Sequence, residues 1–157
     1  MTDTQSPQIT RDLYLEDVTV GDRFVSGEHA LDAEQIKTFA AQYDPQPFHL
    51  DEAAGAQSLF GGLAASGWHT AAITMKLFVA SMPFAEGLIG AGVEVTWPKP
   101  TRADDVLHVE STVQEIKHSR SRPGRGIVTV ETLTLNQDGE IRQRLVSRMV
   151  MFSRPEG

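Results

Sequence analysis

The spacing of apolar residues predicts a helix in the first third of the chain. Its hydrophobic positions recur at i, i+3, i+4 and i+7, as on one helical face: Ile36, Phe39, Ala40 and Tyr43. Asp32 precedes them as a candidate N-cap, with Gln35 three residues later in the capping-box position. The helix is expected to end by Asp44, because a residue that precedes proline is pushed out of the α region.

A longer helix is predicted from about Gly67 to Met82, with Pro83 at its far end. Its apolar positions fall on one stripe: Trp68, Ala71, Ala72, Met75, Phe78, Val79 and Met82. The segment is apolar enough to be the central buried helix of the domain. Between the two helices, Asp51 can cap a short helix that reaches Ala56, and residues 58–62 (SLFGG) are typical of a loop.

The second half of the chain has the alternating, β-branched pattern of strands. Four strands are predicted, at residues 90–97, 106–116, 127–135 and 141–152. The turn signals at 122–124 (RPG) and 138–139 (DG) suit antiparallel hairpins. With a further short strand at 23–31, the order of elements predicts an α+β fold, in which the long helix packs on an antiparallel sheet.

Length and composition limit the class of protein. The chain of 157 residues, 40% hydrophobic and 22% charged, is predicted to form a single domain over residues 12–157 after a mobile polar tail at 1–11. Its 14 Lys and Arg against 21 Asp and Glu give a net charge of −7, which argues against nucleic-acid binding. The chain has no cysteine, no secretory signal pattern and no apolar run near the roughly 18 residues that span a bilayer. We therefore expect no disulfide, no membrane association and a cytoplasmic location.

The stretch YDPQPFHLD, residues 43–51, holds the strongest candidate chemistry. Pro45 and Pro47 each fix φ near −65° and remove a backbone donor, and the residues before them are confined to extended conformations. The backbone, rather than a helical repeat, therefore sets the distance between the carboxyl of Asp44 and the imidazole of His49. A stiff segment of this kind can hold an acid and a base around one water molecule.

A purely structural interpretation of these residues stays open at this point. Asp before proline is a common turn starter, and a single His near a helix start is often a cap or a packed residue. The sequence has no HxxxH or other paired ligands, so we expect no metal site.

Two motifs resemble those of a known family. The segment DPQPFH (44–49) resembles the signature D-x-N-P-x-H of MaoC-like enoyl-CoA hydratases, and SLFGGLAASGWHT (58–70) resembles the segment that follows it. The resemblance covers about residues 12–153, with the motifs in the same order and spacing. It implies a hot-dog fold, an antiparallel sheet wrapped around a long central helix, in a homodimer or a higher homo-oligomer.

The resemblance also implies a reaction. MaoC-like hydratases add water reversibly to the double bond of a 2-enoyl thioester, typically giving the (R)-3-hydroxyacyl product. The CoA or acyl-carrier-protein thioester is the substrate, and no further cofactor is implied. The catalytic Asp and His of the family correspond to Asp44 and His49. Gly67, where free N–H groups begin the long helix, is the candidate oxyanion contact, and Trp68 and Gln46 are candidate pocket residues.

Some positions depart from the family pattern or carry less information. Gln46 stands where the signature has Asn, and Met75 lies near a helix serine of some (R)-hydratases, which leaves the acyl chain length and head group open. His69 is expected to make a local hydrogen bond rather than to act as a third catalytic group. The remaining histidines form no recognisable constellation: His29, His108 and His118.

Two further questions stay open from the sequence. The basic segment 117–125 (KHSRSRPGR), with Arg120, Arg122 and Arg125, is either a solvated hairpin tip or a contact for CoA phosphates from either subunit. The same fold could also serve an acyl-CoA thioesterase or a non-catalytic acyl-thioester-binding subunit. Thioesterases usually place a carboxylate on the central helix, and residues 68–82 have none.

Overall fold

The computed structural model describes residues 11–156, so the tail predicted at 1–11 lies almost wholly outside the described residues. Helices come first and strands follow. The helical elements are a 3-10 turn at Leu15–Asp17, α1 (Ala33–Tyr43), α2 (Pro47–Leu50), α3 (Glu52–Ala56) and α4 (Gly67–Ser81). The strands are β1 (Arg23–Val25), β2 (His29–Ala30), β3 (Ile89–Thr96), β4 (Val106–His118), β5 (Arg125–Leu135) and β6 (Ile141–Phe152).

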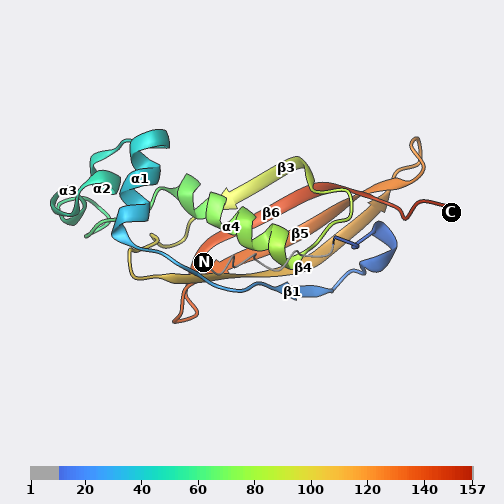
Figure 1. The fold of residues 1–157 in the computed structure, drawn as a ribbon, viewed down its shortest axis with the longest axis horizontal. Coiled ribbons are helices and arrows are strands. Elements are labelled where there is room, and N and C mark those ends of the chain that lie inside the picture. Colours follow the sequence, from blue (N-terminus) through green and yellow to red (C-terminus); the bar gives the residue numbers. More distant parts are fainter. Residues whose placement is uncertain (1–10, 157) are drawn as a thin grey trace, which may run out of the picture.

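The strands form one antiparallel sheet in the order β1-β4-β5-β6-β3, and β2 also pairs with β4. Helix α4 lies along one face of this sheet (Figure 1). Helices α1, α2 and α3 gather beyond the N-terminal end of α4, whereas the tip of the β4–β5 hairpin lies at the opposite end of the molecule (Figure 1). The start of α4 is therefore the place where helices, loops and sheet converge.

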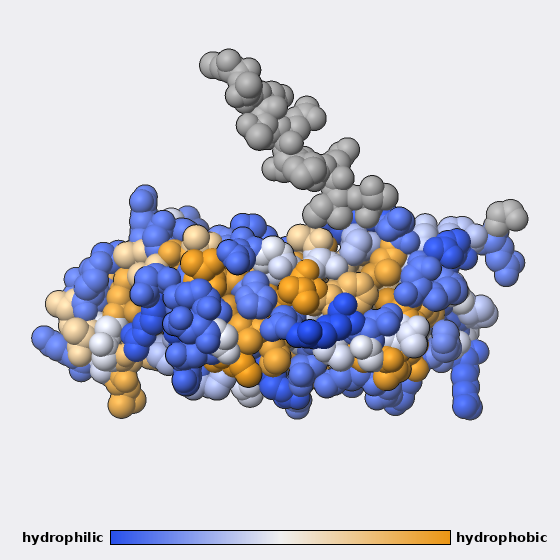
Figure 2. Space-filling view, turned by 90° about the horizontal axis from the view of Figure 1, so that it is seen from below, coloured by the Kyte–Doolittle hydropathy of each residue, from blue (hydrophilic) through white to orange (hydrophobic). Residues whose placement is uncertain are grey.

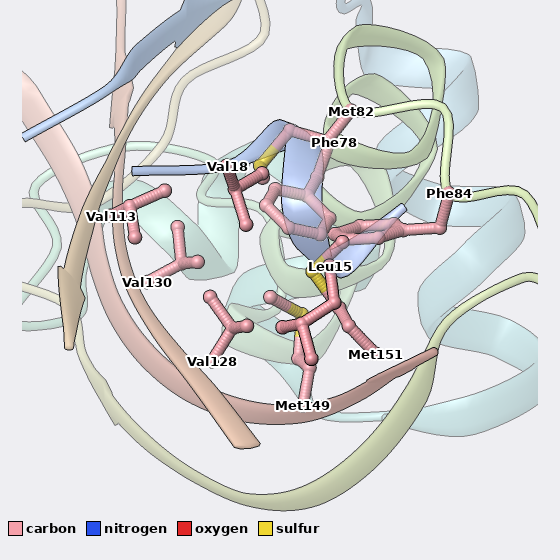
Figure 3. Close-up of a cluster of buried hydrophobic side chains, with 10 residues drawn as sticks. All are labelled: Leu15, Val18, Phe78, Met82, Phe84, Val113, Val128, Val130, Met149 and Met151. Atoms are coloured by element: carbon pink, nitrogen blue, oxygen red, sulfur yellow. The ribbon is translucent and has the colours of Figure 1, made fainter. Parts of the chain in front are cut away.

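Two clusters of buried apolar side chains fix α4 on the sheet. In the first, Phe78 and Met82 pack against sheet residues that include Val113, Val128 and Met149 (Figure 3). The second joins Ile73 and Leu77 of α4 to residues of β4 and α1: Leu107, Val109 and Ile36, with Leu31, Leu63 and Ala65. Burial of these side chains removes apolar surface from water at about 25 cal/mol per Å², and it holds the helix in one position relative to the site described below.

The predicted apolar stripe of α4 is wrong in part. Phe78 and Met82 are buried as expected, but Trp68 is 62% exposed and Met75 is 39% exposed. The face turned to the sheet instead includes Thr70 and Thr74. Apolar residues occur on nearly every side of this helix, so their spacing does not select one face, and the hydrogen bonds that allow two threonines to be buried are invisible in a sequence pattern.

Two smaller predictions need correction. The strand expected over 23–31 is divided into β1 and β2, because Ser26 between them bonds Val109 through both its backbone N–H and its side-chain oxygen. Asp32 caps α1 as predicted, accepting the N–H of Gln35 at 2.8 Å. The side chain of Gln35, however, donates to the carbonyl of Ala30 and does not close the expected capping box.

Apolar side chains are exposed on β3, one of the two outermost strands of the sheet. Ile89 and Val93 of β3 are 51% and 60% exposed, and β3 pairs with β6 on one side only among the described residues. On the face seen in Figure 2, apolar residues show between charged and polar ones. No helix within residues 11–156 is long and apolar enough to cross a bilayer.

Candidate active site

The two prolines place Asp44 and His49 on opposite sides of a sharp turn. Helix α1 ends at Tyr43, and Asp44 leaves the helical region with φ −153° and ψ 67°. Gln46 is extended, as expected before proline, and Pro47 then starts the one-turn helix α2. The predicted interruption between helices is present, but it contains α2, which the sequence analysis did not predict. This turn carries His49 back toward the end of α1.

A backbone carbonyl fixes the tautomer of His49. The ring is only 4% exposed, and its Nδ1 lies 2.6 Å from the carbonyl oxygen of Ala64. Because a carbonyl oxygen only accepts hydrogen bonds, Nδ1 must be the donor. In the neutral ring, Nε2 is then unprotonated, and this atom lies 3.3 Å from Oδ2 of Asp44. Proton exchange at His49 is therefore restricted to Nε2, on the side of Asp44.

Both oxygens of Asp44 receive hydrogen bonds. Ser66 Oγ donates to Oδ2 at 2.7 Å, and Gln46 Nε2 donates to Oδ1 at 2.5 Å. Partial burial tends to raise the pKa of Asp44, but these two hydrogen bonds and the nearby charge of protonated His49 bring it below its ordinary value of 3.8. Asp44 is therefore held as a carboxylate that accepts protons in hydrogen bonds.

Asp44 and His49 therefore present two hydrogen-bond acceptors, Oδ2 and Nε2, to the space between them. A carboxylate and an unprotonated Nε2 cannot bond each other directly, but one water molecule can donate a hydrogen to each. The lone pairs of that water would then point away from both groups. This arrangement can activate water as a nucleophile and take up the proton that it loses.

The start of α4 supplies a hydrogen-bond donor next to this pair. Ser66 is the N-cap of α4 and is fully buried, and its Oγ accepts the N–H of Trp68 at 3.2 Å. The N–H of Gly67 has no acceptor among the described residues. A free N–H at the first turn of a fifteen-residue helix, where the dipole is positive, can stabilise a developing negative charge.

Asp44, His49 and Gly67 line one cavity of about 410 Å³. Five of its lining residues were predicted from the sequence: Asp44, Gln46, His49, Gly67 and Trp68. The other lining residues were not: Phe48, Phe60, Ala65, Thr70, Trp97 and Thr101. The hydrogen bond from Ser66 to Asp44 was not predicted either, although a serine immediately before a helix is a typical N-cap.

Trp97 packs directly against Gly67 in the cavity wall. A Cβ atom added to Gly67 would lie 2.7–2.9 Å from atoms of the Trp97 indole, so only glycine fits against this ring. The indole is held by its Nε1, which donates to Gln143 Oε1 at 2.8 Å, and it meets Trp68 edge to face at 5.5 Å. Gly67 therefore allows a close approach, as expected, but the group that approaches it in this structure is Trp97.

The structure does not bring the basic segment to this cavity within one chain. Arg120 and Arg122 lie at the exposed tip of the β4–β5 hairpin, at the opposite end of the molecule from α1–α3 (Figure 1). Arg125 lies over the ring of Phe152, 5.7 Å from its centroid. None of the three arginines lines the cavity within one chain.

The remaining histidines lie outside the cavity. His69 is buried and stacks on Phe39 with ring centroids 4.5 Å apart, and the hydrogen bond expected for it is absent at Nδ1. Burial, with repulsion from His29, lowers the pKa of His69 to about 4, so it is neutral at ordinary pH. Within residues 11–156, no group of three or more potential ligands is placed to hold a metal ion.

Comparison with known proteins identifies the family. The model of the MaoC-like domain matches residues 13–136. The chain belongs to the MaoC-like family. It is 60% identical to the crystal structure of a MaoC-like dehydratase from Rhodospirillum rubrum, with a TM-score of 0.91 over 92% of this chain and 100% of the other. It is also 33% identical over 126 residues to the uncharacterized protein YdeM of Bacillus subtilis, covering 78% of this chain and 87% of YdeM.

A more distant relative shares the fold. The R-hydratase PhaJ1 of Pseudomonas aeruginosa has a TM-score of 0.72 and 24% identity, over 90% of this chain and 86% of PhaJ1. With these neighbours and the sheet packed around α4, the predicted hot-dog fold and the predicted family are both confirmed. Membership of this family supports a hydratase or dehydratase activity in broad terms.

Proposed function

We propose that the protein catalyses the reversible hydration of a 2-enoyl thioester, with Asp44 and His49 activating the water. The observation that carries this proposal is the geometry of the pair: two acceptors 3.3 Å apart in a cavity beside the free N–H of Gly67. Hydration needs a nucleophilic water for C3, a proton for C2, and stabilisation of the charge on the thioester oxygen. The cavity offers a group for each.

The hydrogen bonds of Asp44 and His49 indicate which of the two takes the proton from water. Both Asp44 oxygens already accept hydrogen bonds and its pKa is lowered, whereas Nε2 of His49 has no donor among the described residues. Nε2 is therefore the acceptor that is free to take a proton. In the proposed step, water oxygen bonds C3, its proton moves to Nε2, and the C2–C3 π electrons move toward the thioester oxygen.

The second half of the proposed cycle restores the pair. The enolate oxygen accepts a hydrogen bond from the N–H of Gly67. This bond stabilises the negative charge that forms on the oxygen only after the water has attacked. The proton on Nε2 then passes to C2, which gives the 3-hydroxyacyl thioester and leaves His49 neutral. Asp44 stabilises the imidazolium between the two steps. Dehydration is the same sequence in reverse.

One assay separates this function from its rivals. Crotonyl-CoA is incubated with the protein while enoyl absorbance and free thiol are followed together. Loss of absorbance without thiol is expected; release of thiol would instead indicate a thioesterase, although α4 has no carboxylate to serve one. If neither signal changes with crotonyl-CoA or with longer enoyl-CoA substrates, a hydratase function is contradicted and a binding role is favoured.

Ser66 is expected to help keep the pKa of Asp44 low. Ser66→Ala removes the donor to Asp44 Oδ2, so the pKa of this carboxyl should rise. The acidic limb of the profile of kcat/KM against pH should therefore move to higher pH, with activity lost on the acidic side and little change at neutral pH.

The matched control for Ser66 is another helix cap. Asp32→Ala removes the N-cap of α1, at a cost to stability of about 1 kcal/mol, but touches neither Asp44 nor His49. It should leave the pH profile in place. If Ser66→Ala and Asp32→Ala behave alike, Ser66 is a helix cap and no more.

We also propose that two copies associate through the open edge of the sheet and the exposed face of α4. Strand β3 is one of the two outermost strands and leaves Val93 exposed, and Trp68 and Met75 leave an apolar surface on α4. Pairing would cover both features. Sedimentation at micromolar concentration should therefore give at least twice the chain mass of 17.2 kDa, and a species of only 17.2 kDa would contradict the proposal.

The dimer would let the basic hairpin of one copy serve the cavity of the other. Replacing Arg120, Arg122 and Arg125 together by Ala is expected to raise KM for a CoA substrate several-fold with kcat nearly unchanged, because binding far from the reacting atoms is lost uniformly. Exchange of Arg23 for Ala is the control, because Arg23 is an exposed residue of β1 that does not line the cavity. Unchanged KM in the triple variant would make the hairpin tip a solvated turn.

A further inference from the structure

The buried end of the cavity is polar. Trp68 and Gln46 lie at its exposed end, whereas Thr70 and Thr101 are only 1% and 3% exposed. Thr70 Oγ1 donates to Thr101 Oγ1 at 2.9 Å. The hydroxyl hydrogen of Thr101 has no acceptor within residues 11–156. The cavity therefore ends at a pair of hydroxyl groups with one unused donor.

A row of hydrogen-bonded side chains lies next to this pair and is joined to it through the carbonyl of Thr70. Trp97 donates to Gln143, and Gln143 Nε2 donates in turn to Thr74 Oγ1 at 3.1 Å. Thr74 Oγ1 lies 2.5 Å from Thr134 Oγ1 and also within 2.8 Å of the carbonyl oxygen of Thr70. Thr74, Thr134 and Gln143 are fully buried. The row ties the central helix to the sheet through polar atoms.

This row limits what can extend beyond the reacting carbons. A long alkyl chain could run between α4 and the sheet only by separating these groups, and each would be left buried without a partner. A short acyl group ends at Thr70 and Thr101 without disturbing the row. Because Thr101 retains a donor, an apolar tip leaves that hydroxyl unpaired, whereas an oxygen at the tip satisfies it.

We propose that the acyl group of the substrate is short and carries an uncharged oxygen acceptor at its far end, bound by the hydroxyl of Thr101. The inference rests on the proposed hydratase function and names its substrate class. A carboxylate tip is disfavoured, because no Lys or Arg lines the cavity and an unpaired buried charge is costly. Thr101 and Thr70 are then specificity-determining residues rather than catalytic ones.

The test compares substrates of equal size. 5-Hydroxy-2-pentenoyl-CoA and 2-hexenoyl-CoA have the same number of non-hydrogen atoms and differ in a terminal hydroxyl or methyl group. The ratio of their kcat/KM values is expected to be about two- to tenfold higher for the wild-type protein than for Thr101→Val, the value of one hydrogen bond. Taking the ratio within each protein removes the different intrinsic reactivity of the two substrates. 2-Decenoyl-CoA should react at least tenfold more slowly than crotonyl-CoA.

Thr132→Val is the matched control. Thr132 is fully buried and its hydroxyl lies 2.9 Å from that of Ser111. The variant therefore also loses a buried hydrogen bond between two hydroxyl groups, but Thr132 does not line the cavity. The substrate ratio of Thr132→Val should equal that of the wild type. If Thr101→Val fails to fold, Thr101→Ser, which keeps the hydroxyl, and Thr101→Ala, which removes it, are measured in its place, and only Thr101→Ala should lower the ratio.

Failure of the inference can be told from failure of the proposed function. An equal ratio in wild type and Thr101→Val, or decenoyl turnover as fast as crotonyl turnover, overturns the inference while hydration stands. Absence of turnover on every substrate overturns the hydratase function instead. In that case calorimetric binding of the two matched thioesters decides the inference: tighter binding of the hydroxylated one, lost in Thr101→Val, supports it, and equal binding overturns it.

Discussion

Replacing Asp44 by Asn, or His49 by Ala, should each lower kcat on a competent enoyl thioester by about 10²–10⁴-fold, the range of general acid–base catalysis. Asn is nearly isosteric with Asp, but it carries no negative charge to stabilise the imidazolium, and its amide nitrogen cannot accept a hydrogen bond. His49→Ala removes Nε2, the proposed proton carrier. Because both residues act on the same water, the double variant should be little worse than either single variant.

The control for this experiment is a second histidine–carboxylate pair. His108 Nε2 lies 3.5 Å from Glu110 Oε2 on β4, outside the cavity. His108→Ala and Glu110→Gln should retain nearly full activity, and thermal unfolding of all variants shows which remain folded. If folded Asp44→Asn and His49→Ala keep activity within about tenfold, a loss of only ~1.4 kcal/mol of transition-state stabilisation, the pair is structural.

Much of the fold could be predicted because periodicity and turn residues act locally. The start of α1 follows from a cap at Asp32, its end from the proline after Asp44, and the hairpin before β6 from Asp138-Gly139. Regular alternation similarly locates the long strands to within a few residues. The prediction of one strand over 23–31 was wrong, because the break between β1 and β2 depends on the hydrogen bonds of Ser26 to Val109, a partner more than eighty residues away.

The site was predictable only for residues that belong to a motif. Asp44, His49 and Gly67 lie in two segments whose composition is unusual in itself. Trp97 reaches the cavity only because β3 ends beside the start of α4, and Thr101 reaches it because its carbonyl accepts the N–H of Ala65. The tautomer of His49 depends equally on a carbonyl fifteen residues away. Such contacts are created by the tertiary fold and leave no local signal.

Gly67→Ala is expected to lower kcat/KM by about 10²–10³-fold, the loss that follows removal of one oxyanion donor. The added methyl group would lie under 3 Å from the Trp97 indole, so one of the two must move. Trp97 is held by Gln143, which is fully buried, and the first turn of α4 is held by Ser66. Any displacement of that turn moves the N–H of Gly67 away from the thioester oxygen.

A second substitution separates crowding from other effects of the new methyl group. Trp97→Leu in the Gly67→Ala background makes room for the methyl group and should recover at least tenfold of the lost kcat/KM, because the backbone N–H is still present in alanine. Gly27→Ala is the control, since an added Cβ there meets no atom within 4 Å. Full activity in Gly67→Ala itself would contradict a role for the Gly67 N–H. It would show that the thioester oxygen is stabilised even when the first turn of α4 is displaced. Recovery in the double variant, with kcat rising more than KM falls, would place the effect in the transition state, where an oxyanion donor acts.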